Sequence, residues 1–360
     1  MIRDTHKNLN CKRSSREVSS LRVILAAGGS GGHIFPCVSL ASELEKAGVK
    51  DVFIVSSRRK LDMNLLGEVK YERFFLSINP MPRKFSFKSI AVFVFNCVKD
   101  LAASVWIIAT KRPKVVVGFG GYSSGAISLA AKIMFVPLVI HEQNAVPGRA
   151  NVILSPIADR IALSFESSRK CFGRYTGKTV FTGNPIRLEI LRNDRVRSAS
   201  LLGISPEKET ILIMGGSQGA GFLNRIMLET ALEIKNKKGR EVQFVHITGQ
   251  GPDKEKVERF YEQHAIPGKV FGFMENIGDA YSVSDMVVSR SGAAAIFEIA
   301  YYGKPMILVP YPNPKNNQAD NARSFSSAEA ALYREEKSLS SEGLCREILG
   351  ILDNAEKRSL

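Results

Sequence analysis

Residues 21–33 read LRVILAAGGSGGH, and this stretch decides the fold of the N-terminal half. Its apolar run has the length and composition of a buried β-strand. The glycines after it predict a tight turn, and residues 34–47 have helical spacing. A strand that passes through a glycine loop into a helix is typical of a parallel sheet covered by helices.

The same alternation continues along the chain and then starts again. Further strands of the first half are predicted at residues 51–55, 115–118, 137–141, 160–163 and 179–182. After a charged stretch, a second series is predicted at residues 210–214, 242–248, 269–273, 286–288 and 306–309. We therefore predict an α/β protein with two doubly wound, Rossmann-like domains that face a central cleft. Their bounds would be 21–188 and 189–360, after a disordered basic leader at 1–20.

Two more loops share the design of residues 28–33. They are GFGGYSSG at 118–125 and GGSQGA at 215–220. Glycine lets the backbone approach an anion closely, and the helix behind it offers unpaired N–H groups and the positive end of its dipole. Three such loops favour a phosphate-bearing ligand over simple tight turns. None has the spacing of a dinucleotide fingerprint or the GK[ST] of a nucleoside-triphosphatase loop, which disfavours both chemistries.

The positive charge of the chain lies in its first half. Residues 1–188 hold 28 basic and 12 acidic side chains, whereas residues 189–360 hold 22 and 23. Such an asymmetry suggests a polyanionic partner, either nucleic acid or an anionic membrane surface. We favour the membrane, because the chain carries no RNA-binding or helix-turn-helix signature. The five cysteines include no CxxC pair, which argues against a disulfide framework or a zinc ribbon.

The segment 81–112 mixes aromatic and basic side chains. Helical spacing predicts a buried stripe composed of Phe87, Ala91, Val94, Val98, Leu101, Val105 and Ile108. The opposite face would carry Phe85, Val92 and Trp106 beside Lys88 and Lys99, a combination that suits a helix lying in a bilayer interface. Lys99 and Asp100 interrupt the apolar run short of about 20 residues, so we do not expect this helix to span a membrane.

Seven motifs, taken in order and spacing, resemble the MurG family of peptidoglycan glycosyltransferases over residues 21 to about 355. They are GGSGGH (28–33), GFGGYSSG (118–125), HEQN (141–144), GNPIR (183–187), GGSQGA (215–220), SRSGAAAIFEIA (289–300) and NNQADNA (316–322). The resemblance implies a GT-B fold. It also implies an inverting transfer of N-acetylglucosamine from UDP-N-acetylglucosamine to the 4-hydroxyl of undecaprenyl-linked muramyl-pentapeptide (lipid I), without a metal or cofactor.

The resemblance further implies a peripheral enzyme at the cytoplasmic face of the bacterial inner membrane. Its partners would be the two substrates and anionic inner-membrane phospholipid, and not nucleic acid. Members of the family usually end in a helix that crosses back to the N-terminal domain. Because the sequence stops at residue 360, we expect either that it is truncated or that this helix is missing.

The resemblance assigns roles to single residues as well. Ser217 and the backbone at the start of the helix near residue 293 would hold the diphosphate, with Arg187 pairing to it. Glu298 would accept the ribose hydroxyls, Met274 would contact uracil through its backbone, and Gln318 would reach the sugar. The complete donor set is Ser30, Gly31, Gly32, Asn144, Arg187, Ser217, Met274, Ala293, Ala294, Ala295, Ile296, Phe297, Glu298 and Gln318.

For the catalytic base we select His33. The acceptor hydroxyl must lose its proton as it attacks, and imidazole is the side chain best suited to that task near neutral pH. Phosphate binding or helix capping is an equally open role for His33. His141 would support Asn144 structurally, and His246 would take no part in function.

Three other functions stay open from the sequence. A glycolipid synthase acting on diacylglycerol would share the fold and the membrane face, although HEQN and GNPIR favour the peptidoglycan enzyme. An isomerase similar to UDP-N-acetylglucosamine 2-epimerase would share the fold but has no use for the basic, aromatic segment 81–112. A non-catalytic nucleotide-sugar or membrane-binding module would have little use for so complete a set of motifs.

Overall fold

The computed structural model of the protein describes residues 18–77, 86–187, 190, 194–216, 220–237, 241–313 and 317–354, without the side chains of Phe87 and Lys88. The chain divides into two compact units, which are described separately here. Unit 1 comprises Met1–Glu142, Gly148–Ala162 and Phe172–Val180. Unit 2 comprises Gln143–Pro147, Leu163–Cys171 and Phe181–Leu360. Of the predicted leader, only residues 18–20 are described, and Val18 packs against the core of unit 1.

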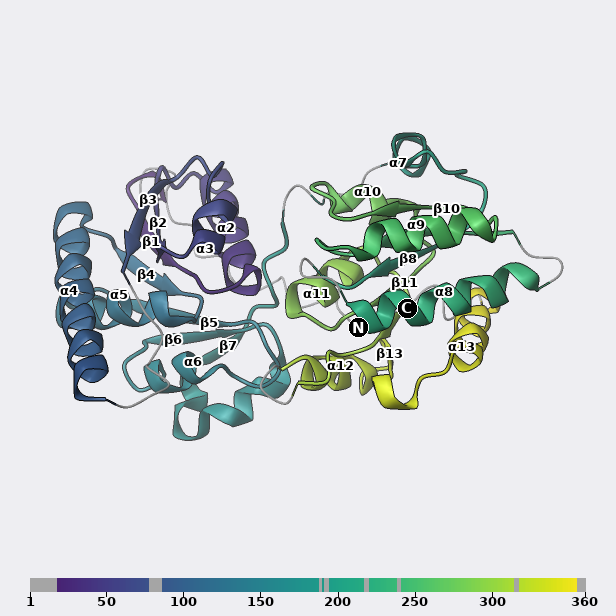
Figure 1. Ribbon diagram of the computed structural model, residues 1–360. Coiled ribbons are helices and arrows are strands. Elements are labelled where there is room, and N and C mark those ends of the chain that lie inside the picture. Colours follow the sequence, from purple (N-terminus) through teal and green to yellow (C-terminus); the bar gives the residue numbers. More distant parts are fainter. Residues whose placement is uncertain are drawn as a thin grey trace. The chain divides into compact units, whose positions relative to one another are not determined.

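Unit 1 is built on a seven-stranded sheet in the order β3-β2-β1-β4-β5-β6-β7. The strands are β1 (Arg22–Ala26), β2 (Asp51–Ser57), β3 (Glu72–Leu76), β4 (Val115–Gly118), β5 (Leu138–Glu142), β6 (Arg160–Leu163) and β7 (Thr179–Phe181). The helices are α2 (Gly31–Lys46), α3 (Lys60–Leu65), α4 (Phe87–Lys111), α5 (Tyr122–Ile133) and α6 (Arg149–Leu154), and the 3₁₀ segment η1 (Glu166–Lys178) contributes to both units. Figure 1 shows α2 and α3 on one face of the sheet and α4 and α5 on the other. The central strands β1 and β2 are therefore almost continuously buried.

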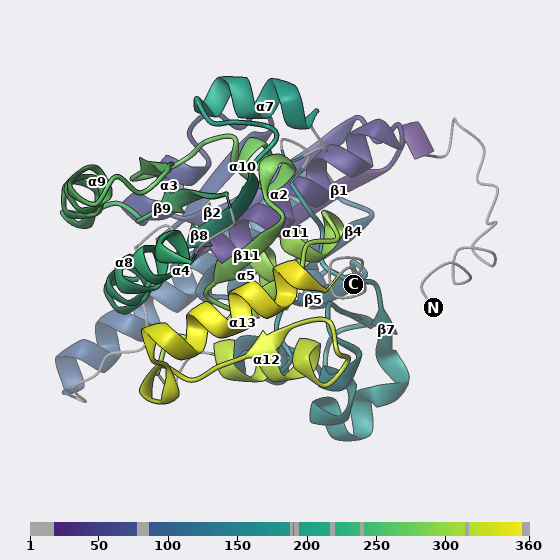
Figure 2. The same cartoon turned by 90° about the vertical axis from the view of Figure 1, so that its right-hand side faces the viewer.

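Unit 2 repeats this plan on a six-stranded sheet in the order β10-β9-β8-β11-β12-β13. The strands are β8 (Glu209–Met214), β9 (Val242–Ile247), β10 (Gly268–Phe271), β11 (Met286–Ser289), β12 (Met306–Leu308) and β13 (Leu332–Tyr333). The helices are α7 (Arg195–Leu202), α8 (Gly221–Asn236), α9 (Asp253–Gln263), α10 (Ile277–Val283), α11 (Ala293–Tyr301), α12 (Gln318–Ser326) and α13 (Ser341–Asp353), with a short η3 (Glu336–Ser338). Figure 2 shows α13 in the foreground; it packs on α8 and buries Leu344, Ile348 and Leu352.

The two sheets confirm the predicted doubly wound fold. Every predicted strand is present within two residues of its predicted bounds. The helix predicted at 34–47 starts earlier, at Gly31, so three residues of the first glycine motif form its first turn. Strands β3 and β13 were not predicted. Both are weak signals, because β3 is a half-buried edge strand and β13 has two residues.

The strand order reverses once in each sheet, and the glycine loops lie at these points. In unit 1, β1 pairs with β4, and Ala26 is opposite Gly118. In unit 2, β8 pairs with β11, and Met214 is opposite Ser289. Loops that leave the carboxyl ends of two adjacent parallel strands lie next to each other. In open α/β sheets this reversal is where ligands bind.

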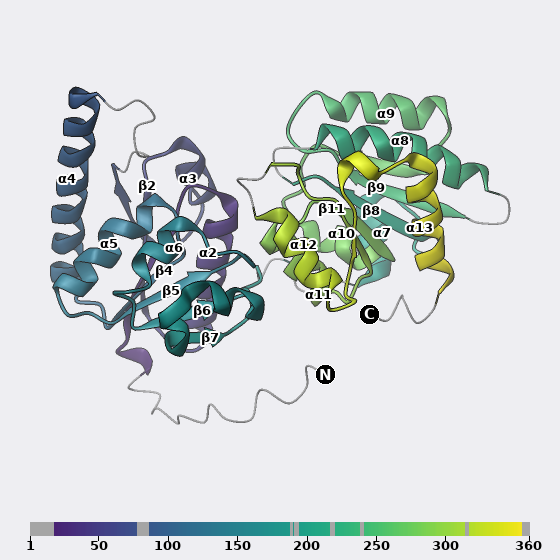
Figure 3. The ribbon, with the colours of Figure 1, turned by 90° about the horizontal axis from the view of Figure 1, so that it is seen from below.

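Helix α4 buries the predicted stripe only in its second half, where Ile108 is buried and Leu101 and Val105 are half-buried. Val94 and Val98 keep 51% and 61% of their surface exposed, and Ala91 is exposed as well. The fully buried positions lie in the second half of the helix and are Asp100, Ser104, Ile107 and Ile108. Figure 3 shows the cause: α4 lies along the outside of unit 1, and its N-terminal half extends past the other elements. The second half therefore packs more fully than the first, in which Phe93 and Asn96 are only half-buried.

The expectation that this helix does not span a membrane stays a prediction. By length and composition alone, Ser89–Lys111 could cross a bilayer despite Lys99 and Asp100. Its surroundings point to another arrangement, however. The carboxylate of Asp100 is buried and accepts the backbone N–H of Ser77 at 2.9 Å, and Ile107 and Ile108 belong to the interior of unit 1. Half of the helix is thus part of the folded unit.

The corrected burial pattern predicts unequal effects of two alanine substitutions. Ile108→Ala should lower the free energy of unfolding by about 2–5 kcal/mol, because it opens a cavity in a buried position. Phe95→Ala, at a side chain that is 68% exposed in the same helix, should change it by no more than about 0.5 kcal/mol. Urea denaturation followed by circular dichroism and by the fluorescence of Trp106, the only tryptophan, measures both. Equal losses would contradict the burial pattern.

Candidate functional site

The first glycine loop places Ser30, Gly31, Gly32 and His33 at the start of α2, where Ser30 is the N-cap. Gly29 has a φ of +91°, a conformation that glycine adopts at no steric cost. Its backbone N–H is held by the carboxylate of Asp62, whose two oxygens lie 3.0 and 2.9 Å from the nitrogen. Asp62 is fully buried at the start of α3. The carboxylate of Asp62 therefore holds this loop in place.

The imidazole of His33 is held in one orientation. Its Nδ1 lies 3.1 Å from the carbonyl oxygen of Gly28 and 3.3 Å from Oγ of Ser30. A carbonyl oxygen only accepts, so Nδ1 carries the proton and Nε2 keeps its lone pair. Nε2 faces the second glycine loop, where a Cβ added to Gly120 would lie 3.5 Å from it. In its neutral form the ring thus presents a proton acceptor beside this loop.

The second glycine loop approaches the first so closely that no side chain fits between them. Gly120 and Gly121 have φ values of +86° and +77°. A Cβ on Gly121 would lie 2.4 Å from the carbonyl oxygen of Gly28. Gly121 must therefore be glycine for two reasons, the backbone conformation and the space available, whereas at Gly120 the positive φ alone favours glycine.

A buried polar group borders the same loop on its other side. Asn151, on α6, donates to the carbonyl of His141 at 3.0 Å and to Glu142 at 2.8 Å. Its Oδ1 is buried without a partner among the described residues, and a Cβ on Gly120 would lie 3.6 Å from it. Buried polar atoms are normally paired, so an unpaired one beside a glycine loop indicates a place for a polar ligand group.

In unit 2 the start of α11 offers backbone donors. Gly292 precedes Ala293, and the N–H of Ile296 donates to the carbonyl of Gly292 at 3.1 Å. The N–H groups of residues 293–295 come before the first hydrogen bond within the helix and can face an anion. The side chains of Ile296 and Phe297 are core groups, since Ile296 is fully buried and Phe297 packs on two other phenylalanine rings. Any contact of Ile296 with a ligand is therefore confined to its backbone.

Glu298 and Arg187, which were expected to bind ribose and diphosphate, are brought together by the structure. Arg187 donates from Nε to Oε1 at 2.8 Å and from Nη2 to Oε2 at 3.0 Å, a bidentate ion pair. The side chain of Glu298 is only 4% exposed. Tyr281 adds a third hydrogen bond, from its hydroxyl to Oε2 at 3.1 Å. Burial first, and then the charge of Glu298, raise the pKa of Tyr281, so its hydroxyl stays a donor.

Asparagines of the NNQADNA motif fix the loop that carries Asn144. Asn321 accepts the N–H of Ala145 at 2.8 Å and donates to Oδ1 of Asn144 at 3.2 Å. Asn317 donates to the carbonyl of Val146 at 2.7 Å. Asn144 therefore belongs to unit 2, although it directly follows β5 of unit 1 in sequence.

The remaining predicted residues fall into four groups. Gln318 begins α12, and its side-chain oxygen accepts the N–H of Tyr311 at 3.0 Å. Met274 is half-buried and packs on the core of unit 2. Ser217, Phe85 and the side chain of Lys88 lie outside the described residues. Val92 and Trp106 are exposed on α4.

Four residues of the site had no predicted role, namely Asp62, Asn151, Tyr281 and Asn321. Asn321 lies within the NNQADNA motif, and this motif was the sequence signal from which its role could have been predicted. The other three stand in helices without a motif, and their partners are distant in sequence. His246 is a core residue: burial lowers its pKa to about 3, and its ring nitrogens pair with Asn224 and Tyr261. Within the described part of the chain, no group of three or more metal-binding side chains is present.

Comparisons with known proteins agree with this geometry. Residues 23–163 match the N-terminal domain of glycosyltransferase family 28, and residues 210–359 match its C-terminal domain. A relative from Desulforamulus reducens is 34% identical over 94% of this chain and 91% of its own length. It is named UDP-N-acetylglucosamine–N-acetylmuramyl-(pentapeptide) pyrophosphoryl-undecaprenol N-acetylglucosamine transferase.

Solved structures share the fold at lower identity. MurG from Acinetobacter baumannii superimposes with a TM-score of 0.71 at 24% identity, covering 94% of this chain and 92% of its own. The UDP-GlcNAc 2-epimerase from Neisseria meningitidis reaches a TM-score of 0.68 at 16% identity, with coverage of 94% and 93%. The family models and the relative's identity decide the assignment, and the chain belongs to glycosyltransferase family 28.

Proposed function

We propose that the protein transfers N-acetylglucosamine from UDP-N-acetylglucosamine to the 4-hydroxyl of undecaprenyl-linked muramyl-pentapeptide, converting lipid I to lipid II. The names of relatives that match over nine-tenths of their length support this reaction. The observation that carries it is the pre-oriented Glu298 carboxylate beside the amide-lined start of α11. Together these groups match the two halves of a nucleoside diphosphate, a ribose and a diphosphate.

Unit 2 would bind the donor. The Glu298 oxygens still have lone pairs for ribose hydroxyls after pairing with Arg187 and Tyr281, since a carboxylate offers about four acceptor positions. The N–H groups of residues 293–295 would stabilise the charge on the departing UDP. In this scheme the helix start performs the task that a metal ion performs in many other transferases.

Unit 1 would activate the acceptor. Nε2 of His33 takes the proton of the 4-hydroxyl while that oxygen bonds to the anomeric carbon of the donor sugar. The bond from this carbon to the diphosphate breaks, and UDP leaves with the electron pair. Attack opposite the leaving group converts an α-linked sugar into a β-linked product. The unpaired Oδ1 of Asn151 is available to accept a second hydroxyl of the acceptor.

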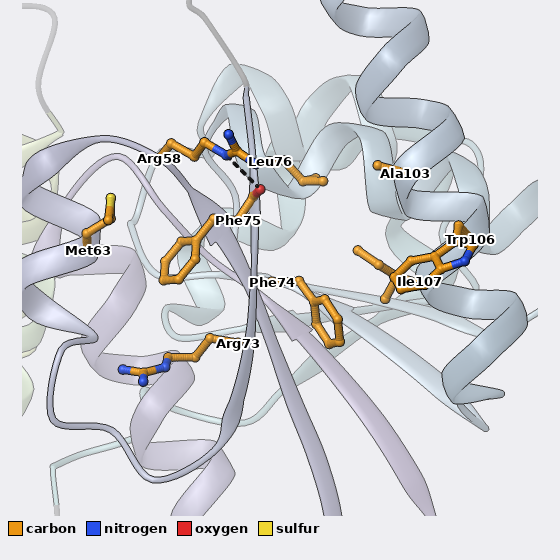
Figure 4. A pocket seen from close by; sticks show the side chains of 9 residues that line it. All are labelled: Arg58, Met63, Arg73, Phe74, Phe75, Leu76, Ala103, Trp106 and Ile107. Carbon is orange, nitrogen blue, oxygen red and sulfur yellow. Dashed lines mark hydrogen bonds between the residues drawn. The ribbon is translucent and has the colours of Figure 1, made fainter.

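The membrane-binding surface would be the exposed side of α4 together with the end of α5. Its large apolar side chains are 43–94% exposed, and they are Ile90, Val92, Val94, Phe95, Val98, Trp106, Leu129, Ile133 and Phe135. A hollow of about 530 Å³ borders Trp106, lined also by Phe74 and Phe75 and by Arg58 and Arg73 (Figure 4). Residues 58–114 carry 12 basic and 4 acidic side chains. Exposed aromatic groups with surrounding positive charge suit the cytoplasmic face of an anionic membrane.

The acceptor lipid can be tested directly. The protein, incubated with radiolabelled UDP-N-acetylglucosamine and either the muramyl-pentapeptide lipid or diacylglycerol, should label only the first. The related family of diacylglycerol glycosyltransferases would show the opposite result. Label recovered as a 2-epimer of the nucleotide sugar, with neither lipid labelled, would replace transfer by isomerisation.

The donor site predicts a specific defect in Glu298→Ala. UDP binding should weaken by about 1–3 kcal/mol, because the ribose hydroxyls lose a charged acceptor. The preference for UDP over 2′-deoxy-UDP should shrink in parallel. Isothermal titration calorimetry measures both, and Glu258→Ala, on helix α9 of the same unit, is the matched control. Retention of the full ribose preference would remove Glu298 from the donor site.

The apolar surface predicts binding to vesicles of anionic phospholipid. Salt should release much of the protein, since surface attraction fades beyond a Debye length of about 8–10 Å. Phe95→Ser and Val98→Ser should weaken the salt-resistant part, which reflects insertion. Leu201→Ser, at an equally exposed residue of unit 2, should not. Co-sedimentation measures this, and equal pelleting of all four proteins would exclude α4 as the membrane-binding surface.

A further inference from the structure

We infer that Asp62 is a positioning residue that selects the tautomer of His33 through the peptide group between Gly28 and Gly29. The inference rests on the role proposed for His33, because only a ring with an unprotonated Nε2 can take a proton there. The hydrogen bonds of the Asp62 carboxylate go to Gly29 and Ser57 and not to the second glycine loop. It acts through one peptide plane.

The geometry of that peptide links the two side chains. The N–H of Gly29 is directed at Asp62, with both carboxylate oxygens within 3.0 Å of the nitrogen. A trans peptide is planar, and its N–H and C=O groups point to opposite sides. The carbonyl of Gly28 therefore points away from Asp62, and it is this oxygen that lies 3.1 Å from Nδ1 of His33. Fixing one end of the peptide fixes the other.

The charge of Asp62 adds an electrostatic effect to the orientation. The partners of its carboxylate are hydrogen-bond donors, the N–H of Gly29 and the hydroxyl of Ser57 at 2.5 Å. An ionised acceptor makes a stronger hydrogen bond than a neutral one, and hydrogen bonds in series polarise each other. The peptide carbonyl thus becomes a better acceptor for the Nδ1 proton of His33. The proton is retained on Nδ1, and Nε2 stays basic.

Packing prevents the peptide from turning over. A Cβ on Gly28 would lie 2.4 Å from Oγ of Ser123 and 2.7 Å from Oδ2 of Asp62. From the other side, Gly121 lies so close to the Gly28 carbonyl that a Cβ on Gly121 would be 2.4 Å from its oxygen. Three segments of unit 1 therefore enclose this peptide. The arrangement gives His33 what a directly bonded carboxylate gives the histidine of a Ser-His-Asp triad, a fixed tautomer and orientation.

The tautomer can be observed without any assay of activity. In full-length protein labelled with ¹⁵N-histidine, the chemical shifts of the two ring nitrogens show which one is protonated, and His33→Gln assigns the signal among the five histidines. Wild type should carry the His33 proton on Nδ1. In Asp62→Asn a substantial fraction should move to Nε2. Turnover should fall by about 10-fold or more, while UDP affinity changes by less than about 2-fold.

Two control variants separate this effect from a general loss of structure. Asp100→Asn also neutralises a buried carboxylate of unit 1, one that holds the N–H of Ser77, and should leave the His33 tautomer unchanged. Ser57→Ala removes the other donor to Asp62 but keeps its bond to Gly29, and should keep the Nδ1–H form.

The outcomes distinguish this inference from the proposed function. A wild-type His33 with its proton on Nε2 overturns the inference even if no variant folds. So does a folded Asp62→Asn whose tautomer equals that of wild type. If the tautomer shifts as expected but His33→Ala keeps full turnover, the positioning by Asp62 stands and the role of His33 as base is wrong.

Discussion

The close contact between two backbone loops, at the point where the strand order reverses, is the constraint on which the rest of the N-terminal site depends. Gly121 and the carbonyl of Gly28 meet at a distance that excludes any side chain. This contact places His33 against Gly120, and it keeps the peptide before Gly29 in a single orientation. A parallel sheet supplies the framework, because β1 and β4 end side by side. The chemistry then follows from which atoms the loops leave exposed.

In unit 2 the constraint is a buried carboxylate, and hydrogen-bonded side chains satisfy it. Its key carboxylate, Glu298, is nearly buried and would be costly to desolvate alone. A bidentate arginine and a buried tyrosine hydroxyl compensate that cost before any ligand arrives. Removal of one partner from such a cluster leaves an uncompensated charge, which is why clusters of this kind are usually rigid. A ribose would therefore meet an acceptor that is already oriented, and little ordering would accompany binding.

The sequence was sufficient for every strand of the two sheets except the edge strands β3 and β13, and insufficient for the contacts between distant residues. Strands such as residues 115–118 and 286–288 are recognisable because each is a short apolar run bounded by turn residues. The stripe on α4 failed for a physical reason. Where almost every position is apolar, as in residues 90–98, periodicity cannot select the face that packs. Gly29, the partner of Asp62, lies 33 residues away, and Glu298, the partner of Tyr281, lies 17 residues away. No local sequence pattern predicts either contact.

Two segments, Gln143–Pro147 and Leu163–Cys171, belong to unit 2. This assignment determines how the protein can be divided into fragments or combined with a relative in a chimera. These segments are flanked by unit 1 in sequence, yet they carry Ala145 and Phe165, which pack with Ala293 in one cluster. A fragment starting at residue 181 would lose both segments and expose Phe297 and Phe325. The two halves are consequently poor modules for exchange at a single junction. A chimera between relatives would have to carry these two short inserts along with the C-terminal half to preserve its interior.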